Sequence, residues 1–334
     1  MKHALILILL CCPAALSAQP LFDADTALRI TLTADFKTLF RDRSEAPEDV
    51  PATLTLYEAT GDSTHFPIQL QVRGHYRRDR CQFPPLRVDF DADSVGGTVF
   101  EGQNKLKLVT HCQSSQQKYN DYVLLEYLVY RSYNALTDSS FRVRLLDITY
   151  RDQTGRKPPI RRMAFFIEAK SAMAGRLGGR ELEQENIHPD ETHRELANLM
   201  SIFQYMIGNT DWSIPGLHNV VLVATTPGMP PLPVPYDFDW SGAVNPPYAF
   251  PNPQLGIRTV RERIFRGFCR SPEEFESAFA RFRAARETIL ARYQQQPGLD
   301  EAARKDALGF LGEFFKTIDD PKAVQRDFIE GCRK

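Results

Sequence analysis

The stretch "FPIQLQVRG" at residues 66–74 alternates apolar and polar side chains, so Phe66, Ile68, Leu70 and Val72 share one face. Successive side chains of a β-strand point to opposite sides, and this alternation is typical of a strand with one buried face. The same pattern recurs at residues 27–35, 52–59, 85–90, 104–112, 141–150 and 161–169. Runs of turn formers such as "TGDST" and "DSVGGT" lie between strands. The first half is therefore predicted to form a mostly antiparallel sheet.

Apolar residues recur at helical spacing at 118–136, at 189–209 and in the tail after Ser271. Asp190 is the expected cap of the second helix, and "SPEE" at 271–274 has the cap, proline and acids of a helix start. A β-hairpin, "HNVVLVAT" to "LPVPYDFDW", interrupts the helical half. We predict an α+β protein with a strand-rich N-lobe at 19–168, which holds one inserted helix, and a mainly helical C-lobe at 169–334. A cleft between two lobes is the expected place for a small-molecule site.

The first residues, "MKHALILILLCCPAALSAQP", have the basic start, short apolar run and small residues of a secretory signal peptide. We assign 1–18 to this signal and expect export to the periplasm, the cell surface or the medium. Cys11 and Cys12 leave a lipid anchor open. No later segment is long and apolar enough for a transmembrane helix. With 41 basic and 42 acidic residues, the chain has no overall field that would attract nucleic acid.

Four cysteines follow the predicted signal, and an even count in an exported protein favours disulfides. Sequence order suggests the pairs Cys81–Cys112 and Cys269–Cys332. The alternative is a metal site built from Cys81, Cys112 and His111, but the sequence contains no CxxC pair of the kind common in such sites.

Two carboxylates end the hairpin, in "VPYDFDWSG" at 234–242. If the strand continues, Asp237 and Asp239 lie on one side, about 7 Å apart, and repel by about 2.4 kcal/mol at an effective dielectric constant of 20. Keeping both ionised then requires a cation. Upstream, "GNTDWSIPGLHNVVLV" places Asp211 in a loop and Asn219 at the start of a strand. A loop aspartate that orients a hydroxyl, followed by an amide and a carboxylate that ligate Mg²⁺ or Mn²⁺, suits phosphoryl transfer.

The segments "GNTDW", "HNVVLV" and "PYDFDWSG" resemble those of the spore-coat CotH kinase family, and "VRGHYRR", "FPPLRVDF", "NKLKLV" and "AFFIEAK" are similar to its strands in outline. The resemblance covers roughly residues 66–245. It implies a two-lobed, atypical protein-kinase-like fold. It also implies that Asp211 is the catalytic acid or base, that Asn219 and Asp237 are metal ligands, and that Asp239 is an accessory ligand.

The same resemblance implies that ATP binds between the lobes with Mg²⁺ or Mn²⁺ and that phosphate passes to a hydroxyl of a protein or small molecule. Glu126 is then expected to pair with a phosphate-binding lysine, either Lys107 or Lys105. Glu168 is expected near the lobe hinge, and Arg73 is expected to contact phosphate or to pair with a carboxylate.

Two other functions stay open. The family's Lys-Lys pair is replaced here by "FPPLR" at 83–87, which favours a catalytically inactive, pseudokinase-like envelope protein that binds a partner. The third alternative is a metal-dependent glycosyltransferase or hydrolase that uses the Asp-x-Asp pair. Such folds usually need alternating parallel strands and helices, which the first half does not show.

Overall fold

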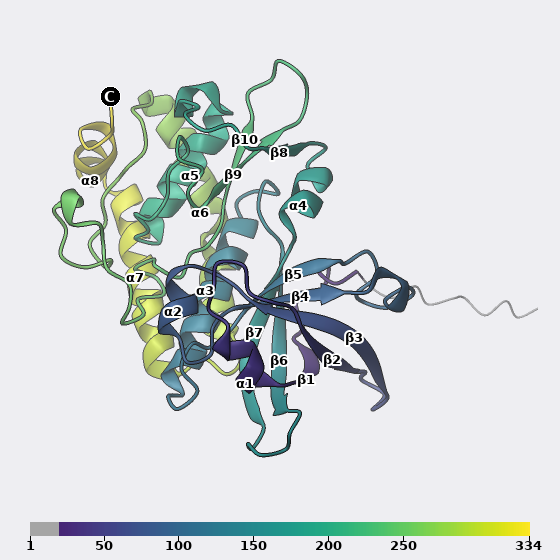
Figure 1. The fold of residues 1–334 in the computed structure, drawn as a ribbon. Coiled ribbons are helices and arrows are strands. Elements are labelled where there is room, and N and C mark those ends of the chain that lie inside the picture. Colours follow the sequence, from purple (N-terminus) through teal and green to yellow (C-terminus); the bar gives the residue numbers. More distant parts are fainter. Residues whose placement is uncertain (1–19) are drawn as a thin grey trace, which may run out of the picture.

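In a computed structural model that describes residues 20–334, seven strands form a closed barrel in the order β1-β2-β3-β4-β5-β7-β6 (Figure 1). The alternation in the sequence predicted each of these strands. Their bounds are β1 Leu28–Ala34, β2 Val50–Tyr57, β3 Ser63–Val72, β4 Leu86–Phe90, β5 Lys105–Val109, β6 Val143–Asp152 and β7 Ile160–Ile167.

The barrel closes through a parallel pair, while all its other neighbouring strands are antiparallel. Strand β1 pairs with β2 on one side and with β6 on the other, in register from Leu28 with Leu146 to Ala34 with Asp152. The prediction of a two-lobed, kinase-like fold with an antiparallel-sheet lobe and a mainly helical lobe is therefore wrong. Alternation tells which face of a strand is buried, but it does not tell whether the first and last strands of a sheet meet.

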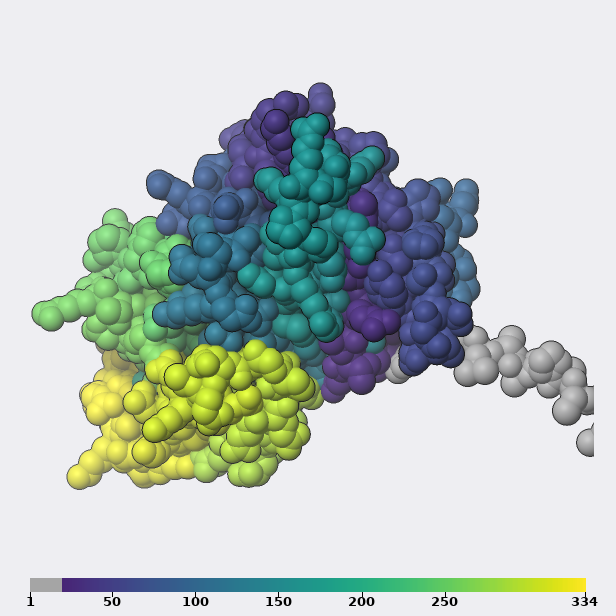
Figure 2. Space-filling view, turned by 90° about the horizontal axis from the view of Figure 1, so that it is seen from below, coloured from purple at the N-terminus to yellow at the C-terminus, as the bar shows by residue number. Residues whose placement is uncertain are grey.

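The rest of the chain is mixed α/β and surrounds a second, three-stranded sheet in the order β10-β9-β8. The barrel and the C-terminal helices occupy different sides of the molecule (Figures 1 and 2). The alternating parallel strands and helices of the third alternative are not found within residues 20–334. The remaining strands are β8 Arg180–Leu182, β9 Val220–Ala224 and β10 Leu232–Pro235, and the helices are α1 Phe36–Arg41, α2 Tyr76–Arg80, α3 Lys118–Asn134, α4 Lys170–Arg176, α5 Arg194–Met206, α6 Pro272–Gln295, α7 Glu301–Asp319 and α8 Pro321–Val324.

Strand β7 supplies side chains to the two largest of the three hydrophobic clusters formed by residues 20–334. Ala164 and Phe166 point into the barrel, where they join the buried apolar residues of the other strands. Phe165 and Ile167 point outward and belong to a larger core built on α3 and the C-terminal helices. Because side chains alternate along the strand, β7 joins the barrel to the helical part and holds α3 between them (Figure 1).

Two helix starts show how local sequence sets the boundaries. Ser271 caps α6, as the sequence predicted, and the structure adds a reciprocal capping box between its side chain and that of Glu274. The predicted start of the preceding helix near Asp190 is wrong: Pro189–Glu191 form a separate 3₁₀ turn. Helix α5 begins later, because the His193 side chain accepts a hydrogen bond from the Leu196 amide.

Both predicted disulfides are present, Cys81–Cys112 and Cys269–Cys332. The alternative metal site is excluded, because its two sulfur atoms are bonded to each other. His111 is fully buried, and burial lowers the pKa of its imidazole to about 3. The predicted signal peptide and the cysteines considered for a lipid anchor lie outside residues 20–334. Within that range, no helix is both long enough and apolar enough to cross a membrane.

Candidate active-site cleft

A cleft of about 650 Å³ lies where one end of the barrel meets the loops around β9 and β10. Six of the predicted site residues line it: Arg73, Lys107, Asp211, Asn219, Asp237 and Asp239. These residues come from the end of β3, from β5 and from the two loop segments. The structure therefore brings together residues that are separated by up to 166 positions in the sequence (239 − 73).

Two glycines join the "GNTDW" and "DFDWSG" segments. The Gly242 amide donates a hydrogen bond to the Gly208 carbonyl oxygen at 3.1 Å. A Cβ on Gly242 would lie 2.3 Å from the Val260 carbonyl oxygen, and one on Gly208 would lie 2.8 Å from the same atom. Gly208 also has a positive φ of 64°. Only glycine fits this close approach of three backbones, which places Asp211 near Asp237 and Asp239.

Asp211 is held by hydrogen bonds from its own loop. His218 Nε2 lies 2.8 Å from one carboxylate oxygen, and Asn219 Nδ2 donates to the other at 3.0 Å. The Asp211 amide donates to the side chain of Asn209, which is almost fully buried. The hydrogen bond to Asp211 raises the pKa of His218 above its ordinary value. The carboxylate is thus oriented at the wall of the cleft, as a group that positions a hydroxyl requires.

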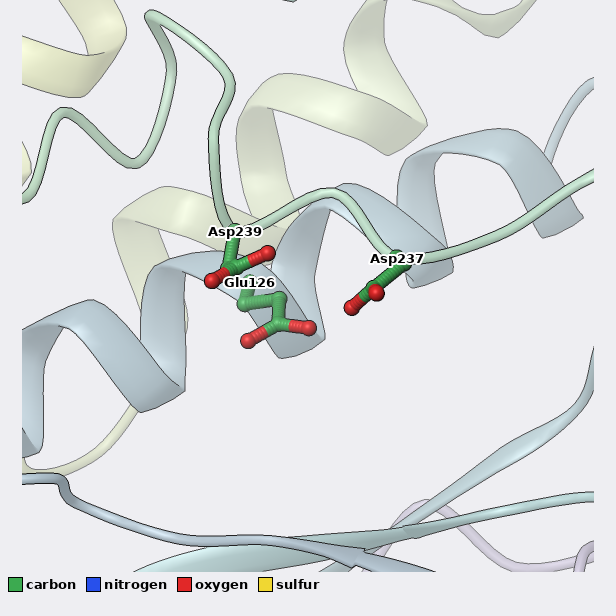
Figure 3. A group of neighbouring side chains, drawn as sticks. All are labelled: Glu126, Asp237 and Asp239. Carbon is green, nitrogen blue, oxygen red and sulfur yellow. The ribbon is translucent and has the colours of Figure 1, made fainter. Parts of the chain in front are cut away.

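Asp237 and Asp239 meet Glu126 of α3 in a compact acidic cluster (Figure 3). One carboxylate oxygen from each of the three residues lies within 4.8 Å of the others. The prediction that a continuing strand aligns the two aspartates is wrong, because β10 ends at Pro235 and Asp237 has a left-handed φ of 62°. The Asp237 amide donates to the Tyr130 hydroxyl at 2.8 Å, which fixes this turn.

Arg77 of α2 already supplies one positive charge to the acidic cluster. Its guanidinium lies 3.4 Å from Glu126, 3.5 Å from Asp237 and 3.2 Å from Asp239. Burial raises the pKa of Glu126 to about 8 and that of Asp239 to about 6, with Arg77 acting in the opposite direction. One guanidinium thus faces three carboxylates, two of which hold protons more tightly than usual. The cluster is short of positive charge, and its hard oxygen donors fit Mg²⁺ or Mn²⁺.

The predicted metal ligands are therefore arranged differently from the expected set. Glu126, expected to pair with a lysine, joins Asp237 and Asp239 in the cluster. Asn219 lines the same cleft, but its side-chain nitrogen binds Asp211. No hydrogen bond from residues 20–334 reaches the Asn219 side-chain oxygen, so this atom is available to a ligand in the cleft.

The cleft also contains two cations. Arg73 and Lys107 line the cleft, and neither makes an ion pair with any residue in the 20–334 range. The Arg73 Nη1 atom is buried without a hydrogen-bond partner. Lys107 lies 4.8 Å from the Tyr236 ring centroid. Burial, together with the charge of Arg73, lowers the pKa of Lys107 to about 8. Two cations without an ion pair to residues 20–334, in the same cleft as several carboxylates, suit an anion that also carries a metal ion.

Two residues assigned to nucleotide binding lie away from the cleft. Lys105 is exposed and pairs with Asp89 at 3.5 Å. Glu168 is buried and pairs with Arg176 at 2.8 Å. Its carboxylate also accepts a hydrogen bond from the Arg142 amide. Of the two candidate lysines, only Lys107 is positioned to contact a ligand in the cleft.

Sequence reasoning missed the residues that complete the site. Arg77, Tyr130 and His218 each contact a predicted site residue, and the Tyr248 hydroxyl acts on the Asp239 carboxyl by lowering its pKa. The only signal was indirect: two acids with no obvious partner require a cation, and "VRGHYRR" offers several arginines. Which arginine turns inward depends on the position of α2, whose C-terminal end is tied to the chain after β5 by Cys81–Cys112.

No family model matches this sequence, and the comparison with curated proteins finds no match to it.

Proposed function

We propose that the cleft binds a nucleoside triphosphate with Mg²⁺ or Mn²⁺ and that the protein transfers the terminal phosphoryl group to a hydroxyl. The observation that carries this proposal is that cations and carboxylates line one cleft, Arg73 and Lys107 together with Asp211 and Asp237. Its volume of about 650 Å³ is in the range of small-molecule sites. The two disulfides support a place of action outside the cytoplasm.

The cations and the carboxylates have distinct parts in this proposal. Arg73 and Lys107 bind the phosphate oxygens and reduce their charge. Glu126, Asp237 and Asp239 would hold the divalent ion, which supplies further positive charge when it is bound. Asp211 orients the acceptor hydroxyl and accepts its proton as the oxygen bonds to the terminal phosphorus. The bond from that phosphorus to the bridging oxygen breaks, and the nucleoside diphosphate leaves.

Metal-dependent binding is the first expected result. At 100 times its dissociation constant, ATP with Mn²⁺ is expected to raise the free energy of unfolding of the wild-type protein by about 2.7 kcal/mol. Asp237→Asn keeps the residue's size and tolerance of a left-handed backbone but removes the charge, so it is expected to lose most of this stabilisation. Chemical denaturation with and without ligand measures both values. Equal stabilisation of the wild type and Asp237→Asn would contradict the site assignment.

The pH dependence of binding follows from Lys107. Its pKa of about 8 in the free cleft lies below the usual 10.5 because burial disfavours the charged form. The charged lysine therefore costs folding stability below pH 8, and that cost is relieved as the pH rises toward 10.5. Phosphate favours the charged form, so ATP affinity is expected to fall above pH 8, by up to about tenfold per pH unit.

Lys107→Arg is the matched variant, because arginine stays charged in this range. The ATP affinity of this variant is therefore expected to vary less than that of the wild type between pH 8 and 10. Isothermal titration calorimetry at several pH values gives the profile. A wild-type affinity that is constant from pH 7 to 10 would show that Lys107 does not contact the phosphates.

Arg77 favours a second candidate function, a protein that uses the cleft to bind a partner without catalysis. The guanidinium contacts all three acids of the cluster and occupies part of the space where a metal ion would bind. If Arg77 excludes the ion, neither Mn²⁺ nor ATP with Mn²⁺ stabilises the wild-type protein. The denaturation experiment on the wild type therefore separates the two functions.

A further inference from the structure

A second cavity, of about 240 Å³, lies beside the loop that carries Asp211 and shares no lining residue with the cleft. Its walls come from α5, from the 212–215 loop, from the segment before α6 and from the C-terminal end of the chain. The residues that matter for its chemistry are Asn198, Trp212, Arg266, Arg270 and Arg333. This volume is much larger than a single water molecule needs.

Three of the side chains that line the cavity carry a buried polar atom without a hydrogen-bond partner. Trp212 is 7% exposed, and its Nε1–H donor is unpaired. The Arg270 side chain is 3% exposed, and its Nε–H donor is unpaired. Asn198 is 5% exposed; its nitrogen donates to the Glu274 carbonyl oxygen, and its Oδ1 acceptor has no partner. Buried donors and acceptors are normally satisfied, so two donors and one acceptor around one cavity indicate a ligand.

The cavity also has an excess of positive charge. Arg270 pairs with Asp190, so its charge is compensated. Arg266 and Arg333 make no ion pair with an acidic residue between positions 20 and 334. Burial lowers the pKa of Arg266, and the nearby charge of Arg333 lowers it further. Arg266 and the exposed Arg333, which form no ion pair within residues 20–334, match a ligand that carries two negative charges, although the Asp211 carboxylate also acts on Arg266.

A disulfide holds two of these arginines in place. Arg270 and Arg333 directly follow Cys269 and Cys332, which are bonded to each other. The Cys269 amide donates to the Arg333 carbonyl oxygen at 2.8 Å, and the Arg333 amide donates to the Gly267 carbonyl oxygen at 2.9 Å. The backbone that carries the charges is thus fixed before any ligand arrives, which lowers the entropy cost of binding.

We propose that this cavity binds a small phosphate monoester that also carries a hydroxyl group. A phosphate monoester has close to two negative charges at neutral pH, which matches Arg266 and Arg333. The phosphate oxygens accept hydrogen bonds from Trp212 Nε1–H and Arg270 Nε–H. The ligand hydroxyl donates a hydrogen bond to Asn198 Oδ1. No residue lines both the cavity and the cleft, so this site is separate from the proposed nucleotide site.

The test is isothermal titration calorimetry of the full chain with glycerol 2-phosphate, a small phosphate monoester with hydroxyl groups. The wild type is expected to bind one equivalent. Trp212→Phe keeps the aromatic ring but removes the donor, and Arg333→Gln removes one charge; each is expected to weaken binding by about tenfold or more. Lys322→Gln, an exposed change in α8, is the matched loss of charge and is expected to have no effect.

Two further binding measurements identify the site and the class of ligand. Binding is expected to persist in Lys107→Gln, which alters only the cleft; a loss there would place the phosphate in the cleft and overturn the proposal. Succinate carries two charges without phosphate, and equally tight binding of succinate would overturn the assignment to a phosphate monoester. Equal affinities of the wild type, Trp212→Phe and Arg333→Gln for glycerol 2-phosphate would also overturn it.

Discussion

Replacing Arg77 with methionine is expected to lower the free energy of unfolding by about 3–5 kcal/mol at pH 8, because it leaves three clustered carboxylates without their cation. Methionine keeps much of the apolar volume, so the loss reports charge rather than a cavity. Urea or guanidinium denaturation measures it. Arg80→Met, an exposed change in the same helix, is the matched control and is expected to change stability by no more than about 0.5 kcal/mol.

The same variant separates electrostatics from packing through its pH dependence. The folded-state pKa values of Glu126 and Asp239 are already raised, to about 8 and about 6, and losing Arg77 raises them further. A carboxyl with a raised folded-state pKa costs stability above its unfolded pKa, and the cost is relieved as the pH falls through the folded value. Arg77→Met is therefore expected to regain stability from pH 8 toward pH 5.

Adding Mn²⁺ is a second way to restore the stability of Arg77→Met. If the cluster can hold a divalent ion, adding Mn²⁺ at pH 8 is expected to recover a large part of the lost stability in Arg77→Met and none in Arg80→Met. An Arg77→Met protein as stable as the wild type at pH 8 would contradict this description of the cluster.

Asp211→Asn is expected to lower phosphoryl transfer by about 10²–10⁴-fold, because asparagine cannot accept the proton of the acceptor hydroxyl. The substitution keeps the size of the side chain and an oxygen for the hydrogen bond from Asn219. Stabilisation by ATP and Mn²⁺ is expected to stay close to that of the wild type, since Asp211 is not part of the acidic cluster.

Transfer is measured by following labelled phosphate from ATP into hydroxyl-bearing proteins and small molecules. A wild-type rate in Asp211→Asn would exclude Asp211 as the proton acceptor. A wild-type protein that binds ATP with Mn²⁺ but transfers no phosphate would favour the non-catalytic function.

Particular residues show which parts of the site were predictable. Asp211, Asn219 and Asp237 were singled out from their residue types and their order around a hairpin, and they do line one cleft. Lys105 and Lys107 were indistinguishable in the sequence, since residues two apart in a strand point to the same side. Only the position of the strand relative to Tyr236 and Asp89 separates them.

Local pattern also misled at two points. The run "LPVPYDFDW" was expected to stay extended to its end, but the left-handed Asp237 ends the alternation and turns its carboxylate toward Asp239 and Glu126. Arg77 was one of several arginines in "VRGHYRR", and nothing in that run marks it as buried. Its role depends on α2, the following disulfide and the acids of two distant segments.

The seven barrel strands, the hairpin and the helices α3, α5 and α6 were predictable from the amino-acid sequence alone, because alternation, helical spacing and capping act between residues close together in the chain. The cysteine pairs were suggested only by their order in the chain. The closure of the barrel through β1 and β6, the acidic cluster around Arg77 and the cavity of Arg266, Arg270 and Arg333 were decided only by the tertiary structure. Strand partners and buried ion pairs depend on which distant segments meet, and that depends on how the whole chain buries its apolar surface.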